Sequence, residues 1–279
     1  MQDASLRAEE RRVSDERPLV EIRKAEKVYR SRHGGIKALS DVNIDIRRSE
    51  FVSVLGPSGC GKSTLLRCLA GLEALTSGEL LIAGRPVQGP PDELGVVFQR
   101  DVLFDWRSVV DNVLLPVEIA RLDIATWKPK ALALLELLGL KGFENRFPWE
   151  LSGGMRQRVS ICRALLMNPN LLLMDEPFGA LDAMTRDELN LELQRVWMAD
   201  AKTVFFVTHS IAEAVFLGDR VVVMSPSPGR VADILEIDLP RPRDLSMRET
   251  PEFGKYTGRI RETFQAMGVM KAARTGPRS

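Results

Sequence analysis

Short apolar runs, separated by polar turns, recur along most of this chain. Between residues 19 and 46, alternating segments such as LVEIRKAEKVY and VNIDI predict antiparallel strands. Residues 51–56 (FVSVLG), 79–84 (ELLIAG) and 94–99 (LGVVFQ) predict further short strands. The continuous apolar runs in LLLMDEP (171–177), TVFFVTH (203–209) and VVVMSP (221–226) are typical of central parallel strands, which are buried on both faces. The pattern predicts an α/β fold.

Helical spacing of apolar residues interrupts this β-rich pattern between about 109 and 139, most clearly in ALALLELLGL. We therefore expect an inserted α-helical subdomain over about residues 100–158. Residues 1–17 carry charge without apolar periodicity and are expected to form a mobile arm. The main domain is predicted over 18–240, and the Pro- and Arg-rich segment 241–279 as a short helical extension with a loose end.

Composition narrows the class of protein. Apolar residues make up 44% and charged residues 28% of the 279, as in ordinary soluble globular proteins. A net charge of +1 provides no strong electrostatic attraction to nucleic acid, so no nucleic-acid partner is expected. The three cysteines have no metal-ligand spacing or disulfide pattern, which indicates a reducing compartment. With no long apolar stretch and no secretory leader, the chain is predicted to be cytoplasmic and to reach a membrane only through a partner.

A glycine-rich loop lies between a predicted strand and a predicted helix. Residues 56–63 (GPSGCGKS) fit the phosphate-loop pattern G-x-x-x-x-G-K-[ST]. The glycines allow backbone N–H groups to turn toward phosphate oxygens at the start of a helix. Lys62 is expected to reach the β- and γ-phosphates, and the Ser63 hydroxyl to help hold Mg²⁺. The alternative is a glycine-rich turn with an incidental lysine, which the strand–loop–helix context disfavours.

The predicted strand in LLLMDEP (171–177) ends in two acids, Asp175 and Glu176. Ligands of open α/β sheets bind at the carboxyl ends of the strands, so Asp175 is expected near the loop as support for Mg²⁺. Glu176 would orient and deprotonate an attacking water. Adjacent acids after a strand are more often a helix cap or a solvated turn. The phosphate loop upstream, and His209 at the tip of another predicted central strand, favour the catalytic interpretation.

The segment 151–158, LSGGMRQR, resembles the signature of ATP-binding cassette (ABC) ATPases, LSGGQ in its commonest form. Residues from about 19 to 240 resemble an ABC ATPase as a whole, with the expected motifs in order. The resemblance implies a RecA-like P-loop NTPase core with an antiparallel β-subdomain. It also implies ATP and Mg²⁺ as ligands, and a homodimer in which each signature closes over the other chain's ATP.

Carried over by motif, the resemblance assigns roles to individual residues. It implies that Tyr29 stacks on adenine, that Gln99 is the Q-loop glutamine near the metal, that Asp182 belongs to the D-loop and that His209 is the switch histidine. Catalysis then rests on Glu176, His209 and Gln99, and the metal site on Ser63, Gln99 and Asp175. The residues expected to contact nucleotide are Tyr29, Gly56, Pro57, Ser58, Gly59, Cys60, Gly61, Lys62, Ser63, Thr64, Ser152, Gly153, Gly154 and Asp182.

Several of these positions have a simpler interpretation. Tyr29 could be a strand aromatic packed in the core. Phe104 and Trp106 could be core aromatics or, as the family resemblance implies, part of a groove for a membrane subunit. A thiol at a helix N-terminus should ionise more readily, so Cys60 is predicted to be alkylated and protected by ATP. The alternative is that Cys60 fills a position tolerant of small residues. Met155 replaces the common signature glutamine, and activity is expected to persist.

The lone nucleotide domain with a short tail resembles bacterial importers, in which separate chains form the permease and the substrate-binding protein. LSGGMRQR, LFDWRSVVDNV and MSPSPGR followed by DLPRPRD resemble the nitrate/sulfonate/taurine importer branch. The resemblance implies a peripheral position at the cytoplasmic face of the plasma membrane. One alternative is an ABC ATPase with a regulatory or mechanical role and no permease. Another is a monomeric P-loop kinase or GTPase, against which the signature and the lack of an N-K-x-D motif argue.

Overall fold

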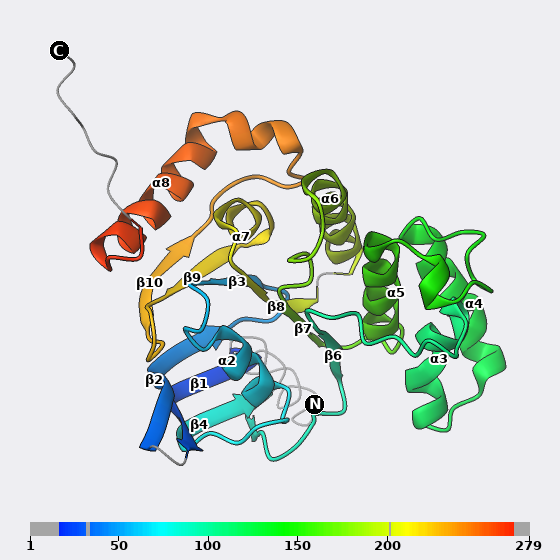
Figure 1. Ribbon diagram of the computed structural model, residues 1–279, viewed down its shortest axis with the longest axis horizontal. Helices are drawn as coiled ribbons and strands as arrows, with labels where there is room; N and C mark the ends of the chain where they lie inside the picture. Colours follow the sequence, from blue (N-terminus) through cyan, green and yellow to red (C-terminus); the bar gives the residue numbers. More distant parts are fainter. Residues whose placement is uncertain (1–16, 32–33, 201, 271–279) are drawn as a thin grey trace, which may run out of the picture.

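The computed structural model describes residues 17–31, 34–200 and 202–270, and its strands form two sheets (Figure 1). The four-stranded sheet has the order β2-β1-β4-β5, and its neighbouring strands are antiparallel. Its strands are β1 (Val20–Ser31), β2 (Gly34–Ile46), β4 (Ser77–Ile82) and β5 (Arg85–Pro86). The alternating N-terminal pattern predicted the antiparallel strands β1 and β2, and the sheet agrees with the antiparallel β-subdomain that the resemblance implied.

The six-stranded sheet has the order β10-β9-β3-β8-β7-β6 and is parallel except at one edge, where β10 runs antiparallel to β9. Its strands are β3 (Phe51–Leu55), β6 (Leu94–Val97), β7 (Leu171–Asp175), β8 (Thr203–Thr208), β9 (Arg220–Met224) and β10 (Val231–Glu236). Strands β3, β7 and β8 are buried along their whole length. Burial on both faces explains why their sequences are continuous apolar runs rather than alternating ones.

The two faces of this sheet belong to two different apolar cores. On one face, Val52 and Val54 of β3 pack in a core shared with the four-stranded sheet and with α2 (Lys62–Leu69). On the other face, Phe51 and Leu55 pack in a core shared with helices from α3 to α8. Strand β3 therefore lies between the two cores, and the loop before α2 follows at its carboxyl end.

A helical layer is inserted between β6 and β7 and lies at one side of the molecule (Figure 1). It contains α3 (Val109–Ile119), α4 (Ile124–Leu137), the short 3₁₀ helix η1 (Pro148–Glu150) and α5 (Gly153–Leu165). Helices α3, α4 and α5 contact one another. Each begins after a residue whose side-chain oxygen accepts from the first turn: Ser108, Asp123 and Ser152.

The remaining helices cover the face of the sheet that is turned away from α2. They are α6 (Ala183–Ala199), α7 (Ile211–Leu217), the 3₁₀ helix η2 (Leu245–Glu249) and α8 (Pro251–Ala266). Arg243, before η2, is 1% exposed and donates to the carbonyls of Val215, Phe216 and Gly218 at the end of α7. The chain after residue 240 is thus joined to the sheet's helical cover.

The α/β fold with an antiparallel sheet and inserted helices confirms the expected fold class. The domain limits predicted from the sequence stay predictions. Residues 1–16 of the predicted arm, and 271–279 of the predicted loose end, lie outside the described residues. Within the described part of the chain, no helix is both long and apolar enough to cross a bilayer.

Candidate active site

The glycine-rich loop joins β3 to α2, as its sequence predicted. Gly61, the residue before α2, has φ 99°, a left-handed conformation that glycine adopts without strain. A Cβ at this position would also lie 2.7 Å from the Ala38 carbonyl oxygen. Ser58 and Gly59 at the tip of the loop are exposed. The loop therefore presents backbone N–H groups and a helix N-terminus to solvent, which is an arrangement suited to phosphate.

Lys62 lies inside this loop. Its side chain is 4% exposed, and Nζ donates to the carbonyl oxygens of Gly56 (2.8 Å) and Pro57 (3.2 Å). The same nitrogen lies 3.6 Å from Glu176 Oε1. A buried cation is thereby held between the loop and the end of β7, where it can attract the charge of a phosphate.

Ser63 and Asp175 bring oxygen atoms together beside the loop. Ser63 Oγ donates to Asp175 Oδ1 at 2.8 Å. Burial raises the pKa of Asp175, while the hydrogen bond from Ser63 opposes that rise. Among the described residues, no group of three or more His, Cys, Asp or Glu side chains could hold a metal by itself. One carboxylate and one hydroxyl nevertheless fit Mg²⁺, which is commonly held by few protein oxygens together with phosphate oxygens.

Glu176 and His209 meet at the carboxyl ends of β7 and β8. His209 Nδ1 lies 3.1 Å from Glu176 Oε2. Glu176 has φ 43°, and its N–H donates to the Val207 carbonyl. A left-handed non-glycine residue costs free energy, and such strain is concentrated at functional sites. The hydrogen bond to β8 fixes the backbone that aims the Glu176 carboxylate at the loop.

Gln99 follows β6 and is exposed. A Cβ placed on Gly179 would lie 3.7 Å from Glu176 Oε2 and 3.8 Å from Gln99 Nε2, so both side chains border Gly179. The structure thus gathers six predicted residues at one edge of the sheet. They are Lys62, Ser63, Gln99, Asp175, Glu176 and His209.

Tyr29 reaches this region from β1. Its hydroxyl donates to Glu73 Oε2 (2.5 Å) and lies 3.3 Å from Thr64 Oγ1 on α2. Lys27 Nζ lies 5.1 Å from the centre of its ring. The ring is only partly buried, so the alternative of a fully packed core aromatic is not what the structure has. Glu73, which holds the hydroxyl, was not among the predicted residues.

The signature residues lie elsewhere, with the helical layer. Ser152 caps α5 by accepting from Met155 N–H (3.3 Å), and both Ser152 and Gly153 are exposed. A Cβ on Gly154 would lie 2.6 Å from Thr185 Cγ2, so α5 approaches α6 closely here. Asp182 caps α6 by accepting from Thr185 N–H (3.0 Å). Figure 1 shows α5 well separated from α2, so the structure does not bring the signature to the loop within one chain.

The expectation that Cys60 forms thiolate readily is wrong. Cys60 is 1% exposed, and burial raises the pKa of its thiol despite the nearby Lys62. The helix N-terminus favours an anion, but removing the sulfur from water costs more. The position takes a small buried side chain, as the alternative interpretation proposed.

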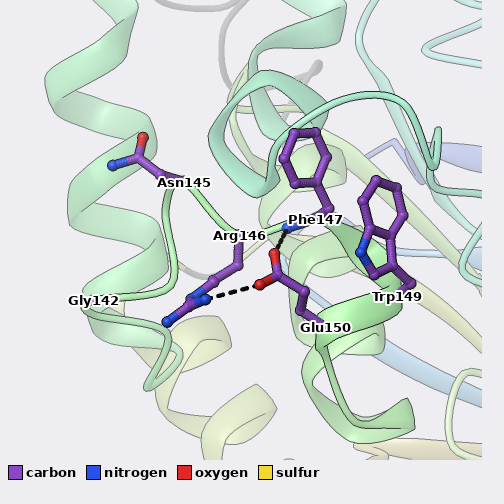
Figure 2. A pocket seen from close by; sticks show the side chains of 6 residues that line it. All are labelled: Gly142, Asn145, Arg146, Phe147, Trp149 and Glu150. Carbon is purple, nitrogen blue, oxygen red and sulfur yellow. Dashed lines mark hydrogen bonds and ion pairs between the residues drawn. The ribbon is translucent and has the colours of Figure 1, made fainter.

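A cavity of about 460 Å³ lies just before the signature, away from the gathered residues (Figure 2). Phe147 and Trp149 stack there with ring centres 4.6 Å apart, and Arg146 pairs with Glu150 at 2.8 Å. None of the predicted nucleotide or catalytic residues lines this cavity.

Comparison with known proteins agrees with this geometry. A family model described as "ABC transporter" matches residues 39–179. An uncharacterised ABC transporter ATP-binding protein of Methanocaldococcus jannaschii is 47% identical over 82% of this chain and 86% of its own length. The taurine import ATP-binding protein TauB of Rhizobium johnstonii is 44% identical over 91% of this chain and 100% of its own length.

A relative of the same name from Escherichia coli is 44% identical over 79% of this chain and 89% of its own length. Among solved structures, a dimeric ATP-binding cassette in a post-hydrolysis state, bound to ADP and Pi, aligns with a TM-score of 0.71. It is 33% identical and covers 79% of this chain and 99% of that one.

Proposed function

The chain belongs to the ABC transporter family as an ATP-binding subunit with ATPase activity, and from that premise we propose that it powers a bacterial importer. The solute would be small and of the nitrate, sulfonate or taurine kind, and it would pass through a separate permease. The support for import is the 44% identity to a taurine import protein over that protein's whole length.

The observation that carries the chemistry is the gathering of the loop lysine and serine with Asp175, Glu176 and His209 at one sheet edge. We assign Lys62 and the backbone N–H groups of residues 58–64 to the phosphates of ATP. Ser63, Asp175 and Gln99 would hold Mg²⁺, which when bound neutralises charge on the phosphate oxygens.

Glu176 is assigned the role of accepting the proton of the attacking water. Its backbone N–H donates to the Val207 carbonyl and its carboxylate contacts His209, which together hold the carboxylate beside the loop. His209 would hold this carboxylate and contact the terminal phosphate. In phosphoryl transfer the protein contributes mainly positioning and electrostatics, so the rate depends on this geometry.

We further propose that two copies pair as a homodimer. Ser152, Gly153 and Gly154 lie at the start of α5, which Figure 1 shows well separated from α2, so they would act on the nucleotide of a partner, and Asp182 would join them there. Ser152 and Gly153 are exposed and can close over that nucleotide. Tyr29 would stack on adenine of its own chain's ATP. The dimer would sit at the cytoplasmic face of the plasma membrane beneath the permease, with a substrate-binding protein as an indirect partner.

The test is affinity purification of the tagged chain from detergent-solubilised membranes of its native host, with mass spectrometry of the co-purifying proteins. We expect a polytopic membrane protein in stoichiometric amount and a substrate-binding protein with it. Soluble partners only, with no tagged chain in the membranes, would contradict the importer and leave an ABC ATPase with a regulatory or mechanical role.

A further inference from the structure

A partly buried ion pair lies behind the Glu176–His209 contact, and its Arg186 side chain is 28% exposed. Glu213, in the first turn of α7, has a side chain that is 7% exposed. Its Oε1 lies 3.4 Å from Arg186 Nε of α6. A carboxylate removed from water is costly unless it has good partners, so the contacts of Glu213 in this place need an explanation.

Each member of the pair also forms a hydrogen bond to a different segment of the site. Glu213 Oε2 accepts from Thr208 Oγ1 at 2.6 Å, and Thr208 is the last residue of β8, directly before His209. Arg186 Nη2 donates to the Leu181 carbonyl at 2.9 Å, and Leu181 adjoins Asp182. The contacts therefore run without a break from the segment 180–182 to the strand tip that carries His209.

The local sequence alone would give Glu213 a different role. Ser210-Ile-Ala-Glu213 matches the capping-box pattern, in which the glutamate returns to the backbone of the serine. Ser210 Oγ does accept from Glu213 N–H (3.3 Å). The carboxylate, however, takes the Thr208 hydroxyl and faces Arg186 instead. It is thus used for contact between elements and not for capping its own helix.

We propose that Glu213 and Arg186 are positioning residues that couple the segment 180–182 to His209. Within one chain this segment lies next to the signature, because a Cβ on Gly153 would lie 3.7 Å from Leu181 Cδ2 and one on Gly154 would lie 2.6 Å from Thr185 Cγ2. In the proposed dimer the signature would contact the partner's nucleotide. A displacement of 180–182 when two chains close would pull on Arg186, Glu213 and Thr208 in turn, and so on the position of His209 against Glu176. This inference rests on the proposed roles of Glu176 and His209.

The test is steady-state ATP hydrolysis by the purified full chain, with kcat and KM measured separately. Glu213→Gln keeps an oxygen for Thr208 but removes the charge facing Arg186. Thr208→Val keeps the branched shape in the strand but removes the hydroxyl. We expect each to lower kcat about tenfold and to leave KM for ATP within about twofold, because only the switch is displaced.

Because both changes break the same line of contacts, the double variant should be no slower than the slower single one. Thr208→Ser, which retains the hydroxyl, should restore kcat. Glu192→Gln is the matched control: it removes an ion pair of the same helix, with Arg158 at 3.1 Å, that touches neither segment. Its kcat should equal that of the wild type.

Wild-type kcat in both Glu213→Gln and Thr208→Val, even with a lowered melting temperature, would show a merely structural pair and overturn the inference. An equal loss in Glu192→Gln would overturn it as well. Glu176→Gln reports on the proposed function independently: inactivity there beside a normal Glu213→Gln rejects the inference alone. Undiminished hydrolysis by Glu176→Gln would reject the proposed function and the inference together.

Discussion

At the scale of single residues, Gly61 is required for two separate reasons. Its φ of 99° strains any other residue, and a Cβ would lie 2.7 Å from the Ala38 carbonyl oxygen. We expect Gly61→Ala to lower the free energy of unfolding by about 2–4 kcal/mol, from strain and overpacking together, and to weaken ATP binding. Urea denaturation and nucleotide titration measure the two effects.

Gly84→Ala is the matched control, because Gly84 has φ 73° but open space where a Cβ would point. It should incur only the strain, about 1–2 kcal/mol, and bind ATP normally. Equal losses of stability in the two variants would mean that crowding against Ala38 contributes nothing.

The cysteines give a second prediction at this scale. All three, Cys60, Cys68 and Cys162, are buried, and burial raises the pKa of each thiol, that of Cys68 to about 11. Because the thiolate is the reactive form, a raised pKa leaves less of it at any pH below that value. We expect a thiol reagent at pH 8 to label the native chain slowly and all three thiols after denaturation. Fast labelling of native Cys60 that ATP blocks would contradict this expectation and support the reactive thiol predicted from the loop sequence.

At the scale of elements, α8 shows that part of the C-terminal segment belongs to the core. Phe253, Ile260 and Phe264 are buried along one side of this helix. Ile260→Ala should lower the free energy of unfolding by about 2–5 kcal/mol, as the removal of a buried branched side chain leaves a cavity. Arg261→Ala, on the neighbouring exposed residue, should change it by less than about 0.5 kcal/mol. Similar unfolding midpoints for the two variants would show that α8 contributes little to the fold.

At the scale of the whole molecule, the proposed homodimer predicts that blocked hydrolysis traps the closed pair. Glu176→Gln should bind ATP, hydrolyse it about 10²–10⁴-fold more slowly and elute as a dimer in ATP. Size-exclusion chromatography with light scattering, with and without ATP, measures the change, and Glu192→Gln serves as the control that returns to monomer. A monomer at saturating ATP would favour an enzyme that works as a single chain.

Much of the fold could be predicted because each element carries its own signal. The apolar runs of β3, β7 and β8 predicted strands buried on two faces, and the helical spacing over 109–139 predicted α3 and α4. Gly71, with φ 67°, follows the C-cap of α2, where a left-handed glycine commonly ends a helix. Strand β10 and helix α6 were not predicted.

The sequence by itself determined which chemistry is available, because a phosphate loop, a strand ending in Asp175 and Glu176, and the signature are local patterns with fixed spacing. Only the tertiary structure decided the burial, pKa and charge partners of residues that contact parts of the chain distant in sequence. Burial between loop and sheet raises the pKa of the Cys60 thiol. Arg243, in a segment that reads as a polar tail, is buried because α7 offers it unpaired carbonyls at its C-terminus. Glu213 faces Arg186, 27 positions away in the sequence, because α6 and α7 pack side by side. Desolvation and the pairing of charges act through space and not along the chain, so local sequence patterns do not predict them.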